Sequence, residues 1–305
     1  MPDIQMRFMK DMLVLSAPLE AILAQRGFNM PRDMPYLLMM EPETVEDALR
    51  AAAMTGAQCL VAPTAGITEA RLAHVRMRED APRLAAAAIE VVRARKPQHI
   101  LVEIGPCGLP LDPGSKTSLN ENRTQYAQAA RAFAGLQLDA FFLNGFTSIA
   151  DLKCALMGIA QVSDAPVFSS VRVANGALEH GMEGVGADVP LADAFVAMAD
   201  LGASVIGFET AEPPEAAVSY ARQAGAFGFP VLAQLCVRER APKQGGPTES
   251  NPYYCADAME KAAVALYGAG VQFLRATGAA TPAYTGALAA TVTGLDVRGY
   301  ADAER

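Results

Sequence analysis

Short apolar runs recur along the chain and are separated by longer segments in which apolar and charged residues mix. Runs of about four to eight apolar residues have the length of strands that are buried on both faces. There are eight such runs, at residues 12–15, 59–62, 100–104, 140–143, 167–173, 205–208, 231–237 and 273–276. The pattern therefore predicts eight buried strands spread over the whole chain.

The segments between these runs have the composition of helices. They are rich in Ala, Leu, Glu and Arg, which favour helix formation, and they lie at residues 43–56, 81–95, 121–135, 149–162, 191–201, 214–225, 256–268 and 282–293. Three of them lead into the next apolar run through Gly56, Gly202 or Gly270 followed by a small residue. Glycine suits the left-handed conformation that ends a helix, so this repeated junction indicates a repeated helix-then-strand unit.

Eight strand and helix units without a change of composition predict a closed parallel (β/α)8 TIM barrel. We expect residues 1–305 to form one domain, with 1–11 and 295–305 as terminal extensions. The segments after strands three, five and seven are long and rich in Gly and Pro, at 105–120, 174–190 and 238–254. Long loops on one face of a barrel carry ligand sites. Residues 17–40 are expected either to cover that face or to pack against the barrel wall.

Composition narrows the class of protein. The chain is 51% hydrophobic with a net charge of −8 and scattered Lys and Arg, which argues against a nucleic-acid partner. No apolar run approaches the roughly 20 residues that span a bilayer, and the first residues lack the apolar core of a signal peptide. Five cysteines without a CxxC spacing are expected to be reduced thiols. These features together predict a cytoplasmic protein.

Active sites of TIM barrels form at the carboxyl ends of the strands, so polar residues there are the candidates. They are Ser16, Thr64, Glu103, Cys107, Asn144, Ser169, Ser170, Arg172, Glu209, Thr210, Gln234, Cys236, Arg275 and Thr277.

Four of these candidates carry charge, and they allow two interpretations. Glu103, Arg172, Glu209 and Arg275 could neutralise one another as a structural network. Alternatively, Arg172 or Arg275 holds a substrate carboxylate while Glu103 or Glu209 acts as acid, base or ammonium partner.

A metal site is a further alternative. Cys107, Cys236 and Cys255 lie on the expected active face, and three thiolates would suffice for a catalytic zinc, but their spacing matches no known motif. His180 in the loop 174–190 is interpreted as a solvated residue. The glycines at 181, 184 and 186 do not lead from a strand into a helix, which argues against a dinucleotide site.

Several segments occur in an order that resembles a known family. They are Leu13-Val14-Leu15, the segment 42–64 with Gly56-Ala57, Gly105-Pro106, the strand at 139–143 and the ending ATGAATPAY at 276–284. From about residue 12 to residue 294 the chain resembles the homocysteine S-methyltransferase family, the barrel found alone or as the first module of cobalamin-dependent methionine synthase. The resemblance implies a TIM barrel and methyl transfer.

The chain departs from that family where the family binds zinc. The family uses one cysteine after strand six, in an Asn-Cys pair, and two after strand eight, in a Gly-Gly-Cys-Cys-Gly run. Here Glu209-Thr210 occupies the first place and RATGA, residues 275–279, the second. The metal holds the substrate sulfur as a thiolate, so loss of all three ligands predicts a different activation.

The positions expected to meet the amino-acid end of homocysteine also differ. The family's Asp-Gly after strand one is Ser16-Ala17 here, and its Glu-Thr after strand four is Asn144-Gly145. Ordinary homocysteine methylation is therefore not expected.

These comparisons lead to the prediction of a zinc-independent methyltransferase acting between a small polar methyl donor or acceptor and a corrinoid or other acceptor. No corrinoid-binding segment follows Gly294, so any cobalamin is expected from a partner protein. Glu209 is assigned as general acid or base, Arg275 as an anion clamp and Glu103 as a third catalytic group. The expected substrate contacts are Ser16, Asn144, Arg172, Thr210, Gln234 and Thr277.

Two alternatives stay open beside this prediction. The barrel could bind a metabolite or a partner without catalysis, or it could be a homocysteine methyltransferase with a rearranged metal site. The substrate, the direction of transfer and a homo-oligomeric state are likewise open.

Overall fold

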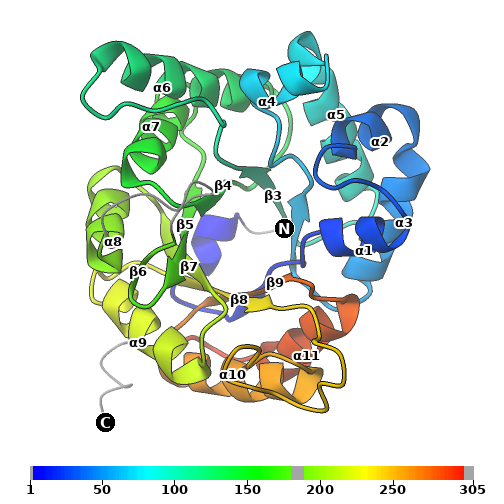
Figure 1. The fold of residues 1–305 in the computed structure, drawn as a ribbon, viewed down its shortest axis with the longest axis vertical. Helices are drawn as coiled ribbons and strands as arrows, with labels where there is room; N and C mark the ends of the chain where they lie inside the picture. The colour runs from blue at the N-terminus through cyan, green and yellow to red at the C-terminus, as the bar shows by residue number, and fades with distance from the viewer. Residues whose placement is uncertain (1–2, 180–188, 299–305) are drawn as a thin grey trace.

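The computed structural model describes residues 3–179 and 189–298, and it confirms the predicted barrel. In the described chain, eight parallel strands follow the order β1-β9-β8-β7-β5-β4-β3-β2 around a barrel (Figure 1). A bridge between Leu15 and Cys59 closes it, and the short β6 (Ala177–Leu178) pairs antiparallel with β5. The eight are β1 (Leu13–Val14), β2 (Cys59–Ala62), β3 (His99–Ile104), β4 (Ala140–Phe146), β5 (Val167–Ala174), β7 (Val205–Thr210), β8 (Val231–Val237) and β9 (Phe273–Gly278).

Helices cover the outside of the barrel, and every helix expected from the sequence is present within a few residues. They are α3 (Pro42–Ala53), α5 (Ala81–Arg93), α6 (Lys116–Arg131), α7 (Ile149–Ala160), α8 (Leu191–Asp200), α9 (Pro214–Gly225), α10 (Ala256–Gly268) and α11 (Pro282–Val292). The largest difference is at α6, which begins five residues before the expected residue 121. The Ser115 hydroxyl accepts a hydrogen bond from the Ser118 N–H at 3.3 Å and so caps α6 there.

Several short helices were not expected, because one or two turns are too short to show a helical period. They are α1 (Glu20–Gln25), α2 (Met34–Met40), α4 (Glu69–His74) and the 3-10 helices at Ile4–Arg7 and Arg78–Asp80. No helix in the described part of the chain is long and apolar enough to cross a membrane.

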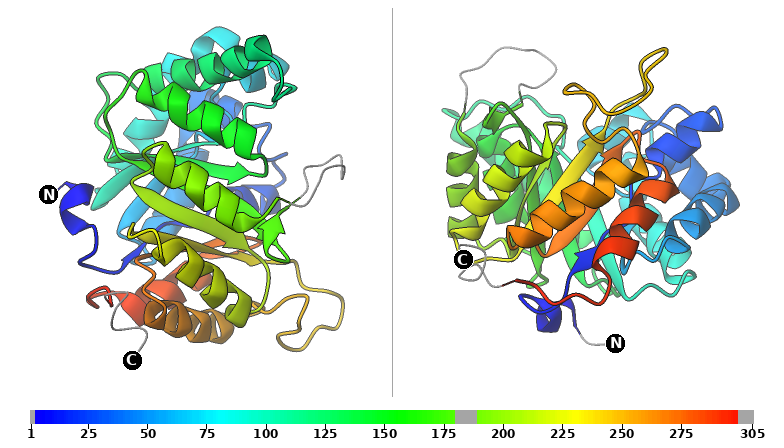
Figure 2. Two further views of the ribbon diagram at one scale, coloured as in Figure 1. Left: turned by 90° about the vertical axis from the view of Figure 1, so that its left-hand side faces the viewer. Right: turned by 90° about the horizontal axis from the view of Figure 1, so that it is seen from below.

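The amino-terminal 3-10 helix seals one end of the barrel. Ile4 is fully buried, and the Phe8 ring lies edge-on to Phe168 and Phe273 with ring centres 6.1 Å apart in both pairs. These rings belong to the apolar filling of the barrel interior. Figure 2 shows this helix at the end opposite the long loop that follows β8. The polar side chains of the interior therefore lie at the other end, the mouth of the barrel.

The loop from residue 238 to residue 255 is held to the mouth by its own hydrogen bonds. The Tyr254 hydroxyl donates to the Gln244 carbonyl at 2.7 Å, and the Tyr284 hydroxyl donates to the Tyr254 carbonyl at 2.7 Å. The Arg240 guanidinium lies 4.4 Å from the centre of the Tyr254 ring. The loop thus has a defined conformation beside the mouth. His180 and the glycines at 181, 184 and 186 lie outside the described residues.

The end of β9 leaves no room for a side chain at Gly278. Its φ is +66°, and a Cβ there would lie 2.4 Å from the Val237 carbonyl oxygen and 2.8 Å from the Cys236 sulfur. We expect Gly278→Ala to cost at least about 2 kcal/mol, because a strained φ and an overlap of atoms each cost roughly 1–3 kcal/mol. Chemical denaturation measures the loss.

Gly286, inside α11, is the matched control. A Cβ there meets nothing within 4 Å, so Gly286→Ala should stabilise the protein by about 0.5–1 kcal/mol. Equal unfolding free energies for the two variants would contradict the crowding at Gly278.

Candidate active site

A buried arginine lies at the centre of the polar side chains in the barrel. Arg275 is only 1% exposed, and its Nε donates to the Ser16 carbonyl at 3.0 Å. Its terminal nitrogens donate to Gln234 Oε1 at 3.2 Å and to Glu103 Oε2 at 3.0 Å. The guanidinium carbon lies 5.1 Å from the centre of the Phe142 ring. A buried cation is tolerated when it is paired and hydrogen-bonded in this way.

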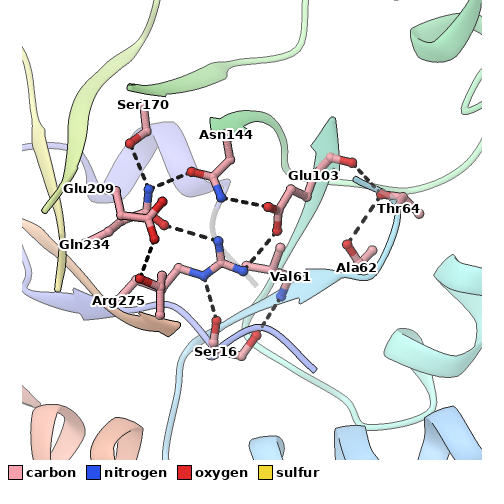
Figure 3. Close-up of polar contacts among 11 residues, drawn as sticks. Ser16, Val61, Ala62, Thr64, Glu103, Asn144, Ser170, Glu209, Gln234 and Arg275 are labelled. Carbon is pink, nitrogen blue, oxygen red and sulfur yellow. Dashed lines mark hydrogen bonds and ion pairs between the residues drawn. The ribbon is translucent and has the colours of Figure 1, made fainter. Parts of the chain in front are cut away.

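Two amides complete a closed ring of hydrogen bonds with this ion pair. Asn144 Nδ2 donates to Glu103 Oε1 at 2.7 Å, and Gln234 Nε2 donates to Asn144 Oδ1 at 2.7 Å (Figure 3). Gln234 Nε2 also donates to the Ser170 hydroxyl at 2.8 Å. Both oxygens of Glu103 are therefore occupied. A buried polar network with all members bonded is rigid and holds its groups in one orientation.

A second cluster surrounds Glu209. Its Oε1 accepts from the Thr277 hydroxyl at 2.7 Å, and its Oε2 accepts from Arg172 Nε at 3.3 Å. Glu209 is buried, whereas the Arg172 side chain is 51% exposed. The charge of Glu209 raises the pKa of Arg172 against the opposing effect of burial. This cluster thus joins a buried carboxylate to a cation that reaches solvent.

The structure brings eight of the nine predicted site residues together in these two clusters, which enclose the mouth side of the barrel interior. Ser16 takes part through its carbonyl, while its hydroxyl accepts from the Val61 N–H at 3.0 Å. The eight are Ser16, Glu103, Asn144, Arg172, Glu209, Gln234, Arg275 and Thr277.

Thr210 is the residue that the structure leaves apart. Side chains alternate along a strand, so Thr210 points away from the face that carries Glu209. Its hydroxyl accepts from the Glu212 N–H at 3.2 Å and donates to Glu212 Oε2 at 3.4 Å. On the neighbouring strand β5, Ser169 also points to the outer face, and its buried hydroxyl has no hydrogen-bond partner among the residues that the structure describes.

The four predicted charges form two ion pairs, Arg275–Glu103 at 3.0 Å and Arg172–Glu209 at 3.3 Å. This pairing is what a structural network requires, and it is also compatible with a site in which the pairs are held ready for a ligand. The geometry does not favour Arg275 as a direct anion clamp, because its side chain is enclosed and bonded on three sides. Arg172 is the exposed cation of the two.

Glu20 lines the mouth beside these clusters and was not among the residues predicted from the sequence. It is the first residue of α1 and lines a groove of about 930 Å³ between α1 and the start of the loop after β8. Burial and the nearby charge of Glu103 raise its pKa, and the charge of Arg275 partly opposes them. The only signal in the sequence is an acidic residue shortly after the end of β1.

The residues at the mouth do not fit a zinc ion. The described chain contains no group of three His, Cys, Asp or Glu side chains placed to hold a metal. Burial, and then the charge of Glu209, raise the pKa of Cys236 to about 11, so it stays a thiol at neutral pH. Cys107 is buried and donates to Asn122 Oδ1 at 2.9 Å. Cys107, Cys236 and Cys255, the thiols of the alternative zinc site, therefore do not form a three-ligand group among the described residues.

Comparison with solved structures finds the same fold in other enzymes. The metallated form of the homocysteine methyltransferase MmuM from Escherichia coli has a TM-score of 0.71 at 15% identity, over 92% of this chain and 96% of that one. Its oxidised form gives 0.70 at 16% identity over the same shares. The catalytic domain of β-amylase from Paenibacillus polymyxa gives 0.58 at 10% identity, over 93% and 95%. Because the sequence identities are this low, the similarity to these structures shows a shared fold and nothing further.

Comparison with curated protein sequences finds no match. The family assignment comes instead from a family model described as homocysteine S-methyltransferase, which matches residues 14–287. That span runs from the last residue of β1 into α11 and includes the other seven barrel strands in full. On this match the chain belongs to the homocysteine S-methyltransferase family and is a methyltransferase.

Proposed function

We propose that this chain is a zinc-independent methyltransferase that moves a methyl group between a small polar substrate and a separate acceptor or donor. The observation that carries the proposal is the environment of Glu209. Directly before Thr210, which stands where the family has its first zinc-binding cysteine, this chain has the Glu209 carboxylate, bonded to the Thr277 hydroxyl and the Arg172 guanidinium. A cation already beside the carboxylate disfavours a metal ion at the same place.

The two clusters suggest different roles for the two ion pairs. The Arg172–Glu209 pair reaches solvent through Arg172, so we assign it to the substrate: Arg172 meets an anionic or polar group, and Glu209 accepts or donates a hydrogen bond or a proton. Arg275 is enclosed and bonded to Glu103, so we assign it to positioning. In this scheme Asn144 and Gln234 keep the Arg275 and Glu103 side chains in a fixed orientation through their hydrogen bonds.

A corrinoid carried by a partner protein is our proposed second substrate. The support is the resemblance to the barrel module of cobalamin-dependent methionine synthase, in which a separate module carries the cofactor. A screen of methylated thiols, amines and aryl ethers against free cobalamin in its reduced state tests this. Methylated cobalamin formed from one of these classes supports the proposal, and no transfer from any of them would refute it.

Metal analysis tests the zinc-independent part. We expect protein purified without chelator to contain well below one zinc per chain, because the described residues include no group of three side chains placed to hold a metal. Cys236→Ser and Cys255→Ser serve as controls and should not change the metal content. About one zinc per chain, lost in either variant, would establish the rearranged metal site instead.

A further inference from the structure

The hydrogen-bonded ring of Glu103, Asn144, Gln234 and Arg275 fills the centre of the barrel below the mouth (Figure 3). Gln234 is fully buried and Arg275 is 1% exposed. Each member of the ring is already bonded to its two neighbours in the ring. A molecule that enters from the mouth therefore first meets the side chains that lie nearer the mouth than the ring.

The next inward-facing positions on β8 and β9 are Cys236 and Thr277. Side chains alternate along a strand, so Cys236 shares the inward face of Gln234, and Thr277 shares that of Arg275. Cys236 and Thr277 are Cα partners across the β8–β9 ladder, which places the thiol and the hydroxyl side by side. Cys236 is half-buried. Its thiol is therefore the nucleophile that β8 presents on the mouth side of the ring.

The Cys236 sulfur also lies at the edge of the groove beside the mouth. A Cβ at Gly278 would lie 2.8 Å from this sulfur, so the sulfur packs directly against the Gly278 backbone. Gly278 and Val237, which follow Thr277 and Cys236 in the sequence, both line the groove of about 930 Å³. The thiol thus borders a space that is large enough for a small methyl donor.

Thr277 connects this thiol to a carboxylate. The Thr277 hydroxyl donates to Glu209 Oε1 at 2.7 Å, so its oxygen is left to accept from the Cys236 thiol. Burial, and then the charge of Glu209, raise the pKa of that thiol to about 11, whereas a hydrogen bond with Thr277 lowers it. Arg172 Nε donates to the other oxygen of Glu209 at 3.3 Å. The four side chains follow the order of a nucleophile, a relay, a base and a group that orients the base.

We propose that Cys236 is the methyl-carrying nucleophile of the site, which takes the methyl group from the donor as S-methylcysteine and then passes it to the acceptor. This inference rests on the proposed methyl transfer and deepens it, because one transfer becomes two displacements at the same sulfur. A thiol that is protonated at neutral pH needs a base when it attacks. Glu209 is that base, and it acts through the Thr277 hydroxyl.

Both displacements balance without a further reagent. In the first, the thiol proton moves to the Thr277 oxygen as the Thr277 proton moves to Glu209. The sulfur electron pair forms the bond to the methyl carbon, and the pair of the broken bond stays on the donor. In the second, an electron pair of the acceptor, a reduced corrinoid, attacks the same methyl carbon. The sulfur keeps the pair of the broken S–C bond and regains its proton from Glu209 through Thr277.

Mass spectrometry in the absence of an acceptor tests the first displacement. Trimethylsulfonium is the donor, because its leaving group is a neutral thioether that needs no proton. The wild-type chain should gain the mass of one CH2 group on the peptide that contains Cys236, and Cys236→Ser should gain none there. Cys255→Ser is the matched control and should be labelled like the wild type, because Cys255 precedes α10 and belongs to neither cluster.

Addition of reduced cobalamin to the labelled protein tests the second displacement. The methyl group should leave Cys236 and appear in an equal amount as methylcobalamin. A label that stays on Cys236 after cobalamin is added would overturn its role as carrier.

Two replacements of Thr277 test the relay. Thr277→Val removes the hydroxyl at nearly the same volume and should slow the labelling of Cys236 by about 10²- to 10⁴-fold. Thr277→Ser keeps the hydroxyl and should be labelled at close to the wild-type rate. Thermal unfolding curves show that both variants are folded under the assay conditions. Equal labelling rates in the two variants would contradict the relay.

The outcomes separate this inference from the proposed function. Transfer to cobalamin by Cys236→Ser at the wild-type rate, with no label on the wild-type chain, would overturn the carrier role and leave methyl transfer standing. No label and no transfer from any donor of the screen would contradict the proposed function and the carrier role with it.

Discussion

Replacing Glu209 by glutamine is expected to lower methyl transfer by about 10²- to 10⁴-fold, the range found for proton-transfer groups, while the barrel stays folded. Glutamine has the same size and can still accept from the Thr277 hydroxyl. It cannot neutralise Arg172, which lies 3.3 Å from the carboxylate in the native protein. The turnover number with the best donor of the screen, together with the thermal unfolding curve, measures the effect.

Glu215→Gln provides the matched control, because Glu215 is an exposed residue in the first turn of α9, outside the barrel. It should leave both activity and stability near the wild-type values. Unchanged activity in Glu209→Gln would remove Glu209 from the mechanism. A loss of activity that only accompanies unfolding would favour the structural-network interpretation of the four charges.

The second large effect concerns stability. Replacing Arg275 by methionine is expected to cost about 3–5 kcal/mol, because removing one partner of a buried ion pair leaves the other uncompensated. Glu103 would keep its bond from Asn144 but lose the cation, and Gln234 Oε1 would lose its donor. Urea denaturation followed by circular dichroism measures the free energy of unfolding.

Two further variants identify the cause of that loss. Adding Glu103→Gln to Arg275→Met removes the uncompensated carboxylate and should restore part of the stability. Arg78→Met breaks the exposed pair with Glu69 and should cost less than about 1 kcal/mol. If Arg275→Met proved no more costly than Arg78→Met, the ion pair would not contribute to holding the barrel together.

The fold could be predicted from the sequence because its strands are buried on both faces. Such strands appear as continuous apolar runs, and the helices between them are long enough to show their composition. The short α1, α2 and α4 gave no such signal. Their positions depend on what they pack against, and a single turn carries little periodic information.

The position of the candidate site could be predicted, because the barrel fold places the carboxyl ends of all strands at one end. Polar residues at the carboxyl ends of strands were expected at the mouth, and eight of the nine residues assigned to the site lie in the two clusters there. Side chains alternate between the two faces of a strand. Once Glu209 is known to point into the barrel, its neighbour Thr210 must point outward and lie outside the site. The enclosure of Arg275 was not predictable, because its partners include a carbonyl, at Ser16, that is far away in the sequence. Glu20 was missed since it lies on an unrecognised short helix.

The pairing of β1 also bears on how the polypeptide acquires its fold during synthesis. Leu13 and Val14 pair with Phe273 and Leu274, whereas the ladder contact between this segment and β2 is the single Leu15–Cys59 bridge among the described residues. At ribosomal speeds of about 5–20 residues per second, the nascent β1 waits roughly ten seconds to a minute for its main neighbour. Throughout that interval an apolar edge stays open to mispairing, so we expect chaperone capture to raise the yield of native protein.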